Sequence, residues 1–272
     1  MTEFFQAGPH RFPLDRTYLM GIVNTTPDSF SDGGRYLEPA EAVRRGKQLL
    51  EEGADILDIG GESTRPGFTP VPWEEELRRV LPVVKALSPL APVSIDTTKY
   101  EVAEAALEAG ACVINDIWGF VREPRLAELA ARTGAGAVLM HNREEPAEGP
   151  LWEELKTFFH RSVKTALEAG MRPEQLCLDP GVGFGKTYKQ NLEAINCIDR
   201  IRELGYPVLL GVSRKSVVGL TLEEPVDRRL EGTLACGCVG IVRGASFLRV
   251  HDVLANRRAA RMTDAILRGD RQ

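Results

Sequence analysis

Short, continuously apolar runs alternate along the chain with longer amphipathic stretches. A run of this kind is too short for a buried helix, and it is typical of a strand covered on both faces, as in a parallel sheet. The pattern therefore predicts eight buried parallel strands. The runs occupy residues 17–24, 54–61, 92–98, 111–117, 136–142, 175–181, 207–213 and 246–252.

The stretches between these runs have the periodicity of amphipathic helices, and several end in glycine just before the next run. Examples are residues 40–53, 74–87, 101–110 and 191–205. Eight strand–helix units of about 34 residues each predict an α/β fold, a (β/α)8 TIM barrel in a single domain spanning 1–272 with its core at about 17–268. The alternative is a doubly wound open sheet, which more often has about five to seven strands.

Polar residues gather where the predicted strands end. In a barrel the carboxyl ends of the strands meet at one face, and active sites of this fold lie there. Any one of these residues could simply cap the following helix, but so many strand ends in register predict an active site. The residues are Asn24, the segment 62–65, Asp96, Asn115, Asp116, His141, Asp179, the segment 213–216, Arg249 and His251.

The last of these strand ends predict a site for an anion. Arg249 and His251 are two residues apart on one strand, so they point to the same side, where they would suit a diphosphate. Ser216 is expected near a helix N-terminus, which favours a carboxylate or phosphate. The structural alternative for Arg249 is a salt bridge to Asp252 or Glu62.

Carboxylates stand opposite these cations. They are Asp58, Asp96 and Asp179, accompanied by Asn115. Asp96 and Asp179 close apolar runs, and a buried carboxylate is costly unless N–H donors meet it. A heterocycle with amidine-type N–H groups would supply such donors, while Asn115 and Lys215 could pair with its ring nitrogens and carbonyl.

For several segments and residues the sequence leaves the function undecided or argues against one. The glycine-rich segment 181–187 does not match a phosphate loop, since Pro180 stands where the pattern needs glycine, and it is expected to be a flexible loop over the barrel mouth. The loops 24–35 and 61–72 have the length of binding loops or lids. His141 is equally compatible with a structural and a functional role, whereas His10, in an N-terminal tail, and His160 are expected to have none.

Composition and charge limit the classes of partner that the protein is expected to bind. Thirty-four basic and 39 acidic residues give a net charge of −5, which argues against nucleic acid or an anionic membrane as the main partner. No apolar run approaches the ~18 residues of a membrane span. Five cysteines without zinc spacing or a disulfide framework indicate a reducing, cytoplasmic compartment.

The same residues carry a family resemblance. Seven segments, in order along the chain, together resemble the dihydropteroate synthase family from near residue 17 to near residue 253. They are MGIVNTTPDSFSDGG (20–34), DIGGESTRPG (58–67), SIDTTK (94–99), IND (114–116), LDPGVGFGK (178–186), GVSRKS (211–216) and RVHDV (249–253).

The resemblance implies a Mg²⁺-dependent transferase of folate biosynthesis, expected to be a cytoplasmic homodimer acting on small molecules. It would join (7,8-dihydropterin-6-yl)methyl diphosphate to 4-aminobenzoate, giving 7,8-dihydropteroate and diphosphate.

The resemblance also implies roles for the residues at the matched positions. Asn24 would bind the metal. Thr64, Asp96, Asn115, Asp179 and Lys215 would hold the pterin diphosphate, with Arg249 and His251 on its diphosphate. Phe30, Arg65, Pro66, Phe184 and Ser216 would frame the aminobenzoate, and Asp28, Ser29 and Asp32 would lie in the first mobile loop. Asp96, Asp179, Lys215, Arg249 and His251 are the expected catalytic residues.

Two segments depart from the family pattern. Trp118 replaces a serine after the fourth strand, and MHNREEPAEGP (140–150) replaces a sequence resembling Met-His-Met-Gln-Gly after the fifth.

The alternative functions are a pterin-binding barrel without activity, a corrinoid-dependent methyltransferase domain and a phosphate-binding barrel such as an aldolase. The methyltransferase would need a cobalamin-binding domain or partner. The aldolase would need a Schiff-base lysine, for which Lys215 is the only candidate.

Overall fold

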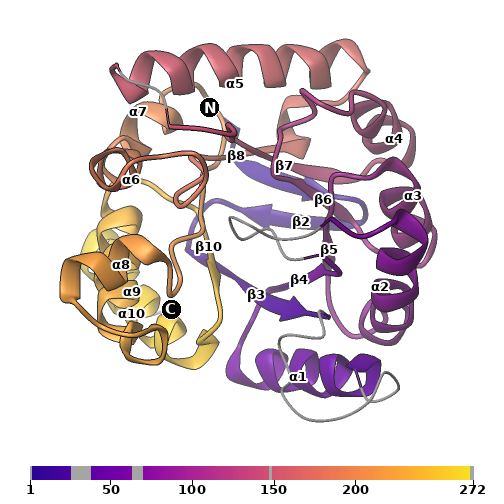
Figure 1. Ribbon diagram of the computed structural model, residues 1–272, viewed down its shortest axis with the longest axis horizontal. Coiled ribbons are helices and arrows are strands. Elements are labelled where there is room, and N and C mark those ends of the chain that lie inside the picture. Colours follow the sequence, from indigo (N-terminus) through magenta and orange to yellow (C-terminus); the bar gives the residue numbers. More distant parts are fainter. Residues whose placement is uncertain (1, 26–37, 63–69, 147–148, 270–272) are drawn as a thin grey trace.

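Each predicted apolar run contains a strand. The computed structural model describes residues 2–25, 38–62, 70–146 and 149–269 (Figure 1). The eight strands from these runs are β3 (Tyr18–Asn24), β4 (Ile56–Gly60), β5 (Val93–Asp96), β6 (Val113–Asp116), β7 (Gly136–Met140), β8 (Leu176–Asp179), β9 (Leu209–Leu210) and β10 (Phe247–Val250).

These strands form one parallel sheet in the order β8-β7-β6-β5-β4-β3-β10-β9. A parallel bridge between Leu178 and Val208 joins the two ends of that order, so the sheet closes on itself. Closure and eight parallel strands confirm the predicted TIM barrel and exclude the open sheet.

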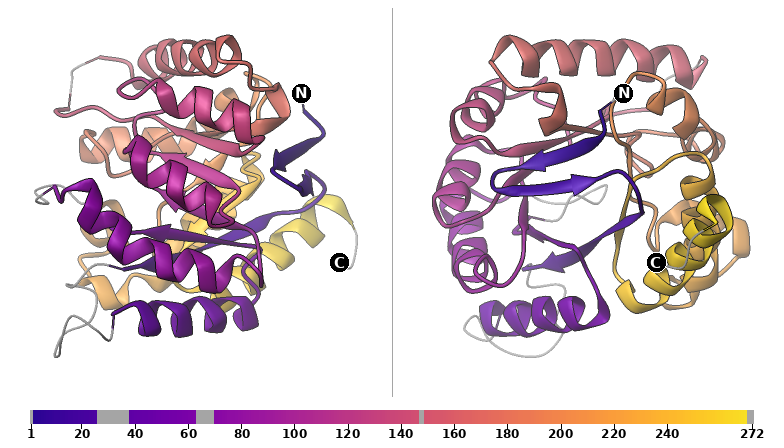
Figure 2. Two further views of the ribbon diagram at one scale, coloured as in Figure 1. Left: turned by 90° about the vertical axis from the view of Figure 1, so that its right-hand side faces the viewer. Right: turned by 180° about the vertical axis from the view of Figure 1, so that it is seen from behind.

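Helices surround the barrel (Figures 1 and 2). Their apolar faces pack on outward-facing strand residues such as Leu57, Ile114 and Leu178, which form the larger hydrophobic core. The α-helices are α1 (Glu38–Glu52), α2 (Trp73–Leu87), α3 (Tyr100–Glu108), α4 (Arg125–Thr133), α5 (Leu151–Glu168), α6 (Tyr188–Asn196), α7 (Ile198–Arg202), α8 (Ser216–Leu222), α9 (Leu230–Val242) and α10 (Val253–Arg268). Two short 3-10 helices are η2 (Pro173–Gln175) and η3 (Val226–Arg228). Among the described residues, no helix has both the length and the apolar character needed to cross a membrane.

The first residues do not form the expected tail. They form an antiparallel hairpin of β1 (Phe4–Ala7) and β2 (His10–Pro13), which crosses the N-terminal end of the barrel (Figure 2, right). Phe5 and Phe12 enter the barrel floor, where the ring of Phe5 lies 5.5 Å from that of Phe247. The domain core therefore begins at the hairpin, about a dozen residues before the predicted start.

The barrel interior is layered because side chains alternate along each strand. The lowest inward positions are apolar and pack on the hairpin, among them Ile56, Val113, Cys177 and Phe247. Two residues further along the same strands the inward positions become polar. These are Asp58, Asn115, Asp179 and Arg249, joined by Asp96 of β5.

Candidate active site

Arg249 lies at the centre of this polar layer. Its Nε donates to Oδ2 of Asp58 at 2.5 Å, and its Nη2 donates to Oδ2 of Asp96 at 2.6 Å. The side chain of Asp58 is fully buried, and that of Arg249 is 18 % exposed. Asn115 also donates to Oδ2 of Asp58, at 3.2 Å. Burial alone would lower the pKa of Arg249, but the two carboxylates more than offset it, so the guanidinium stays charged.

The structural alternative for Arg249 named the wrong partners. Asp252 pairs with Arg214, at 2.5 Å and 2.9 Å, and Glu62 pairs with Lys99 at 2.7 Å. Arg249 does form salt bridges, but they run across the barrel mouth to residues far earlier in the chain.

Asp58 and Asp96 each have one carboxylate oxygen that Arg249 does not bind. Within the described part of the chain, Oδ1 of Asp58 and Oδ1 of Asp96 are buried without a hydrogen-bond partner. A buried acceptor without a donor is unfavourable, so these oxygens favour a ligand that brings N–H groups. Burial raises the pKa of Asp96, and Arg249 only partly opposes that rise.

Asp179 and Lys215 extend the layer toward β8 and β9. Asp179 accepts the backbone N–H of Gly181 at 2.7 Å, and burial raises its pKa. Lys215 donates from Nζ to the carbonyl oxygen of Val182 at 2.5 Å. Burial lowers the pKa of Lys215 to about 8, against the pull of Asp179.

Phe184 and Ser216 lie beside Lys215. The ring centroid of Phe184 is 4.7 Å from the Lys215 ammonium, and Ser216 is the exposed first residue of α8, as predicted. On the β8–β9 side the structure thus brings Asp179 and Lys215, assigned to the pterin, close to Phe184 and Ser216, assigned to the aminobenzoate.

The two histidines at strand ends differ in environment. His251 shares a hydrogen bond of 3.0 Å between Nδ1 and the hydroxyl of Ser213, while Arg249 turns to its carboxylates. His141 is buried against Phe158, with Nε2 at 3.1 Å from Glu154, and burial lowers its pKa to about 2. A buried neutral imidazole held by α5 favours the structural role for His141.

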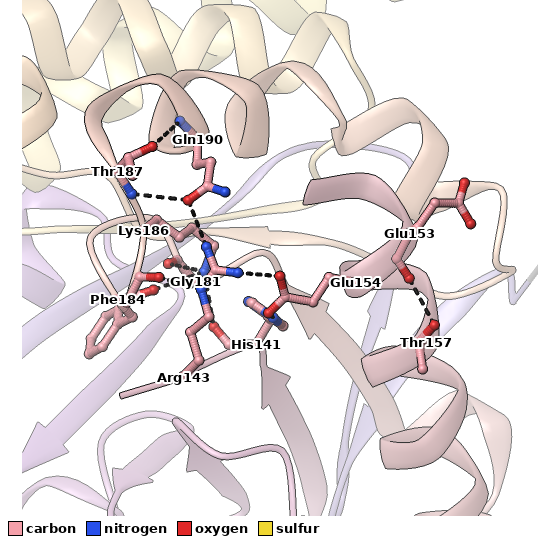
Figure 3. A network of polar contacts seen from close by, with 11 residues as sticks. His141, Arg143, Glu153, Glu154, Thr157, Gly181, Phe184, Lys186, Thr187 and Gln190 are labelled. Atoms are coloured by element: carbon pink, nitrogen blue, oxygen red, sulfur yellow. Dashed lines mark hydrogen bonds and ion pairs between the residues drawn. The ribbon is translucent and has the colours of Figure 1, made fainter. Parts of the chain in front are cut away.

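The segment 181–187, expected to be a flexible loop over the barrel mouth, is anchored by several hydrogen bonds. Lys186 is buried beneath it, and its Nζ donates to the carbonyl oxygens of Gly181, Phe184 and His141 at 2.8, 3.1 and 3.3 Å (Figure 3). Burial lowers the pKa of Lys186 to about 7. Sequence reasoning missed this residue, although a lysine at the end of a glycine-rich turn was a usable signal.

The two segments that depart from the family pattern contact each other. Arg122 stacks on Trp118, with 3.2 Å between its guanidinium carbon and the ring centroid, and donates to Glu144 at 2.6 Å. Both side chains of the ion pair are largely exposed, so the pair contributes little to stability.

A resident metal site is not built into the described residues, which hold no cluster of three histidine, cysteine or acidic side chains suited to a metal. Asn24 is the half-buried last residue of β3, at the barrel mouth. One amide oxygen fits Mg²⁺ delivered with phosphate oxygens, because this ion keeps most of its waters and takes few protein ligands.

Seven predicted residues lie outside the described ranges: Asp28, Ser29, Phe30, Asp32, Thr64, Arg65 and Pro66. So does most of each long loop, 24–35 and 61–72. Asp58 is the functional candidate that the resemblance did not assign, although its place before a predicted strand end had put it opposite the cations.

Comparisons with known proteins agree with this geometry. A family model described as "Pterin binding enzyme" matches residues 20–251. A dihydropteroate synthase of Clostridium beijerinckii is 53 % identical, and the match covers 93 % of this chain and 96 % of the relative. A solved dihydropteroate synthase of Xanthomonas albilineans with 4-aminobenzoic acid is 43 % identical, with a TM-score of 0.93 and coverage of 98 % and 99 %. Another, in complex with 7,8-dihydropteroate, is 41 % identical, with a TM-score of 0.90 and coverage of 97 % and 99 %.

Proposed function

The chain belongs to the dihydropteroate synthase family, and we propose how its own residues carry out the family's reaction. The protein is a transferase of folate biosynthesis that condenses (7,8-dihydropterin-6-yl)methyl diphosphate with 4-aminobenzoate to 7,8-dihydropteroate and diphosphate. The observation that carries our assignment is the polar layer, in which one guanidinium is held by two buried carboxylates that each retain an unpartnered oxygen.

The pterin ring occupies the polar layer in this proposal. Its N–H groups donate to the unpartnered oxygen of Asp96 and to Asp179, which removes the cost of leaving buried acceptors without donors. Asn115 and Lys215 donate to its ring nitrogens and carbonyl. Thr64, which lies outside the described residues, is assigned to the same ligand on the family resemblance.

The diphosphate lies on the β10 side. Arg249 uses Nε and Nη2 on its carboxylates, and a guanidinium has five N–H groups, so others remain for phosphate oxygens. His251, held at Nδ1 by Ser213, is assigned to the same group. Arg249 by its charge and His251 by a hydrogen bond stabilise the negative charge that grows on the diphosphate as it leaves.

The reaction needs little proton chemistry from the protein. The bond between the pterin methylene carbon and the diphosphate oxygen breaks, and its electron pair leaves with the diphosphate. Asp96 and Asp179 stabilise the cationic pterin methylene by their charge. The amine nitrogen of 4-aminobenzoate then forms the new C–N bond and releases one proton to solvent or diphosphate. Phe184 and Ser216 frame this second substrate, together with Phe30, Arg65 and Pro66 from outside the described residues.

Three further assignments concern the metal ion, the cellular compartment and the oligomeric state. Mg²⁺ held by Asn24 would neutralise diphosphate charge when bound, which the oxygen ligand at the barrel mouth supports. The cytoplasm is the proposed compartment, supported by five free cysteines, of which Cys112 and Cys177 lie in the apolar barrel floor. A homodimer is proposed on the family resemblance alone.

The test measures diphosphate release and dihydropteroate formation together. The protein is incubated with the pterin diphosphate and Mg²⁺, with and without 4-aminobenzoate, and again with EDTA. We expect diphosphate and 7,8-dihydropteroate in equal amounts, with Asp179→Asn weakening pterin binding. Tight pterin binding without product would instead identify a binding protein without synthase activity.

A further inference from the structure

Arg143 is a buried cation in the segment that departs from the family pattern. Its side chain is only 12 % exposed, and it donates to acceptors from three parts of the chain (Figure 3). They are the carbonyl oxygen of Gly185, the carboxylate of Glu154 on α5, and Oε1 of Gln190 on α6 at 2.6 Å. A guanidinium with its several N–H groups is suited to joining three acceptors in this way.

Two of these acceptors fix the loop that follows β8. Gly185 belongs to the loop itself, and Gln190 forms a capping box with Thr187 at the start of α6, so its amide already holds the end of the loop. By contacting both, Arg143 ties the outer half of the loop to the end of β7.

The two loops pack too closely for side chains at their contact. A Cβ at Gly185, where φ is +53°, would overlap the carbonyl oxygen of Arg143, and a Cβ at Gly181 would overlap that of His141. The backbone after β7 is therefore the surface on which the loop after β8 rests.

The inner half of the loop has separate supports. The N–H of Gly181 donates to Asp179, and that of Gly183 donates to Asn191 at 2.5 Å. Phe184 lies beyond these two anchors and next to Gly185. Lys186 binds the Phe184 carbonyl from below, but Arg143 is the side chain that holds Gly185 from the outside.

We propose that Arg143 is a positioning residue that fixes Phe184, and through it the aminobenzoate side of the site, while the pterin side stays held by other contacts. This inference deepens the proposed function and rests on it. It gives Arg143, in a segment that departs from the family pattern, a role in this chain, because its side chain reaches the loop that carries Phe184.

The test compares Arg143→Gln with Arg161→Gln, the same change at an exposed arginine on α5. Glu154 is 35 % exposed in the native protein and can be hydrated, so the Arg143 variant should fold. We expect the KM for 4-aminobenzoate to rise about tenfold, because Phe184 is no longer held in one position for this substrate. The KM for the pterin diphosphate and the affinity for a pterin measured by calorimetry should change less than about twofold. Arg143→Lys should recover part of the loss, because an ammonium can still reach one or two of the acceptors.

Hydrogen exchange followed by mass spectrometry gives a second readout independent of turnover. Amides of residues 183–187 should exchange faster in Arg143→Gln, whereas those of β8 should not change. Equal losses for both substrates, or an unchanged exchange pattern, would overturn the positioning role. If the wild-type protein made no dihydropteroate, the proposed function would fail, and the exchange result would still decide whether Arg143 holds the loop.

Discussion

Replacement of Arg249 by methionine tests the polar layer most directly. Methionine keeps much of the apolar stem of arginine but removes the charge from between Asp58 and Asp96, whose side chains are 0 % and 7 % exposed. Breaking a buried ion pair by removing one partner costs about 3–5 kcal/mol, because a charge is left without compensation. Here two carboxylates lose the same partner, so we expect a loss at least at the upper end of that range.

The assay is thermal unfolding at several pH values. For a domain of this size the loss corresponds to a decrease in Tm of roughly 10 °C near neutral pH. Burial already raises the pKa of Asp96 in the wild type, and loss of the opposing Arg249 charge will raise it further above the ~3.9 of an unfolded aspartate. A group with a raised folded pKa stabilises the fold at low pH, and this contribution is lost as pH rises through the folded pKa. The difference in Tm between Arg249→Met and wild type should therefore narrow as pH falls toward about 5.

Two further variants make the reasoning refutable. Arg44→Met removes an arginine that is 77 % exposed and pairs with Glu41 within α1, and it should cost less than about 0.5 kcal/mol. Asp58→Asn added to Arg249→Met should restore part of the stability, because one buried charge disappears. A Tm for Arg249→Met within about 2 °C of wild type at neutral pH would refute the buried ion pairs.

Two other substitutions and one pH profile test separate parts of the molecule. Gly181→Ala should lower turnover by about 100-fold in steady-state assays, because the new Cβ overlaps the carbonyl oxygen of His141 and forces the loop away. Phe5→Ala should lower the free energy of unfolding, measured with urea, by about 3–5 kcal/mol, since this buried ring closes the barrel floor. The pH profile of kcat/KM for the pterin diphosphate should fall above about 8, where the Lys215 ammonium loses its proton. Stability has the opposite sign: with a folded pKa below the unfolded value of ~10.4, Lys215 makes the fold more stable as pH rises between the two.

Each of these changes has a matched control. Gly134→Ala also places alanine at positive φ (+74°), but nothing lies within 4 Å of the new Cβ among the described residues, so turnover should persist. Phe4→Ala truncates a half-buried ring on the other face of β1 and should cost clearly less than Phe5→Ala. Lys215→Arg should move the alkaline limb to higher pH, and a limb that stays in place would assign the titration to another group.

The barrel was predictable because its determinants are local and repeated. Eight apolar runs of strand length, each followed by helical periodicity, predict parallel strands before any contact between the strands is known. The hairpin escaped this reasoning because two strands of four residues joined by a turn at Gly8 are too short for a periodic signal. Phe5 and Phe12 are apolar because they cover the open end of the barrel. That end forms only when the other strands have assembled, so the sequence of the hairpin alone does not reveal it.

The site likewise has features that the sequence predicts and features that depend on the assembled barrel. Alternation along a strand is a local property, so the inward positions of Asp58, Asp179 and Arg249 follow once the strands are known. The partners of Arg249 do not follow, because register across the closed barrel, rather than proximity in sequence, brings it to Asp58 and Asp96 and leaves Asp252 to Arg214. Contacts between loops are harder still. They depend on how far one long side chain, such as that of Arg143, extends. The anchoring of the loop after β8 can therefore be seen only in the assembled mouth of the barrel.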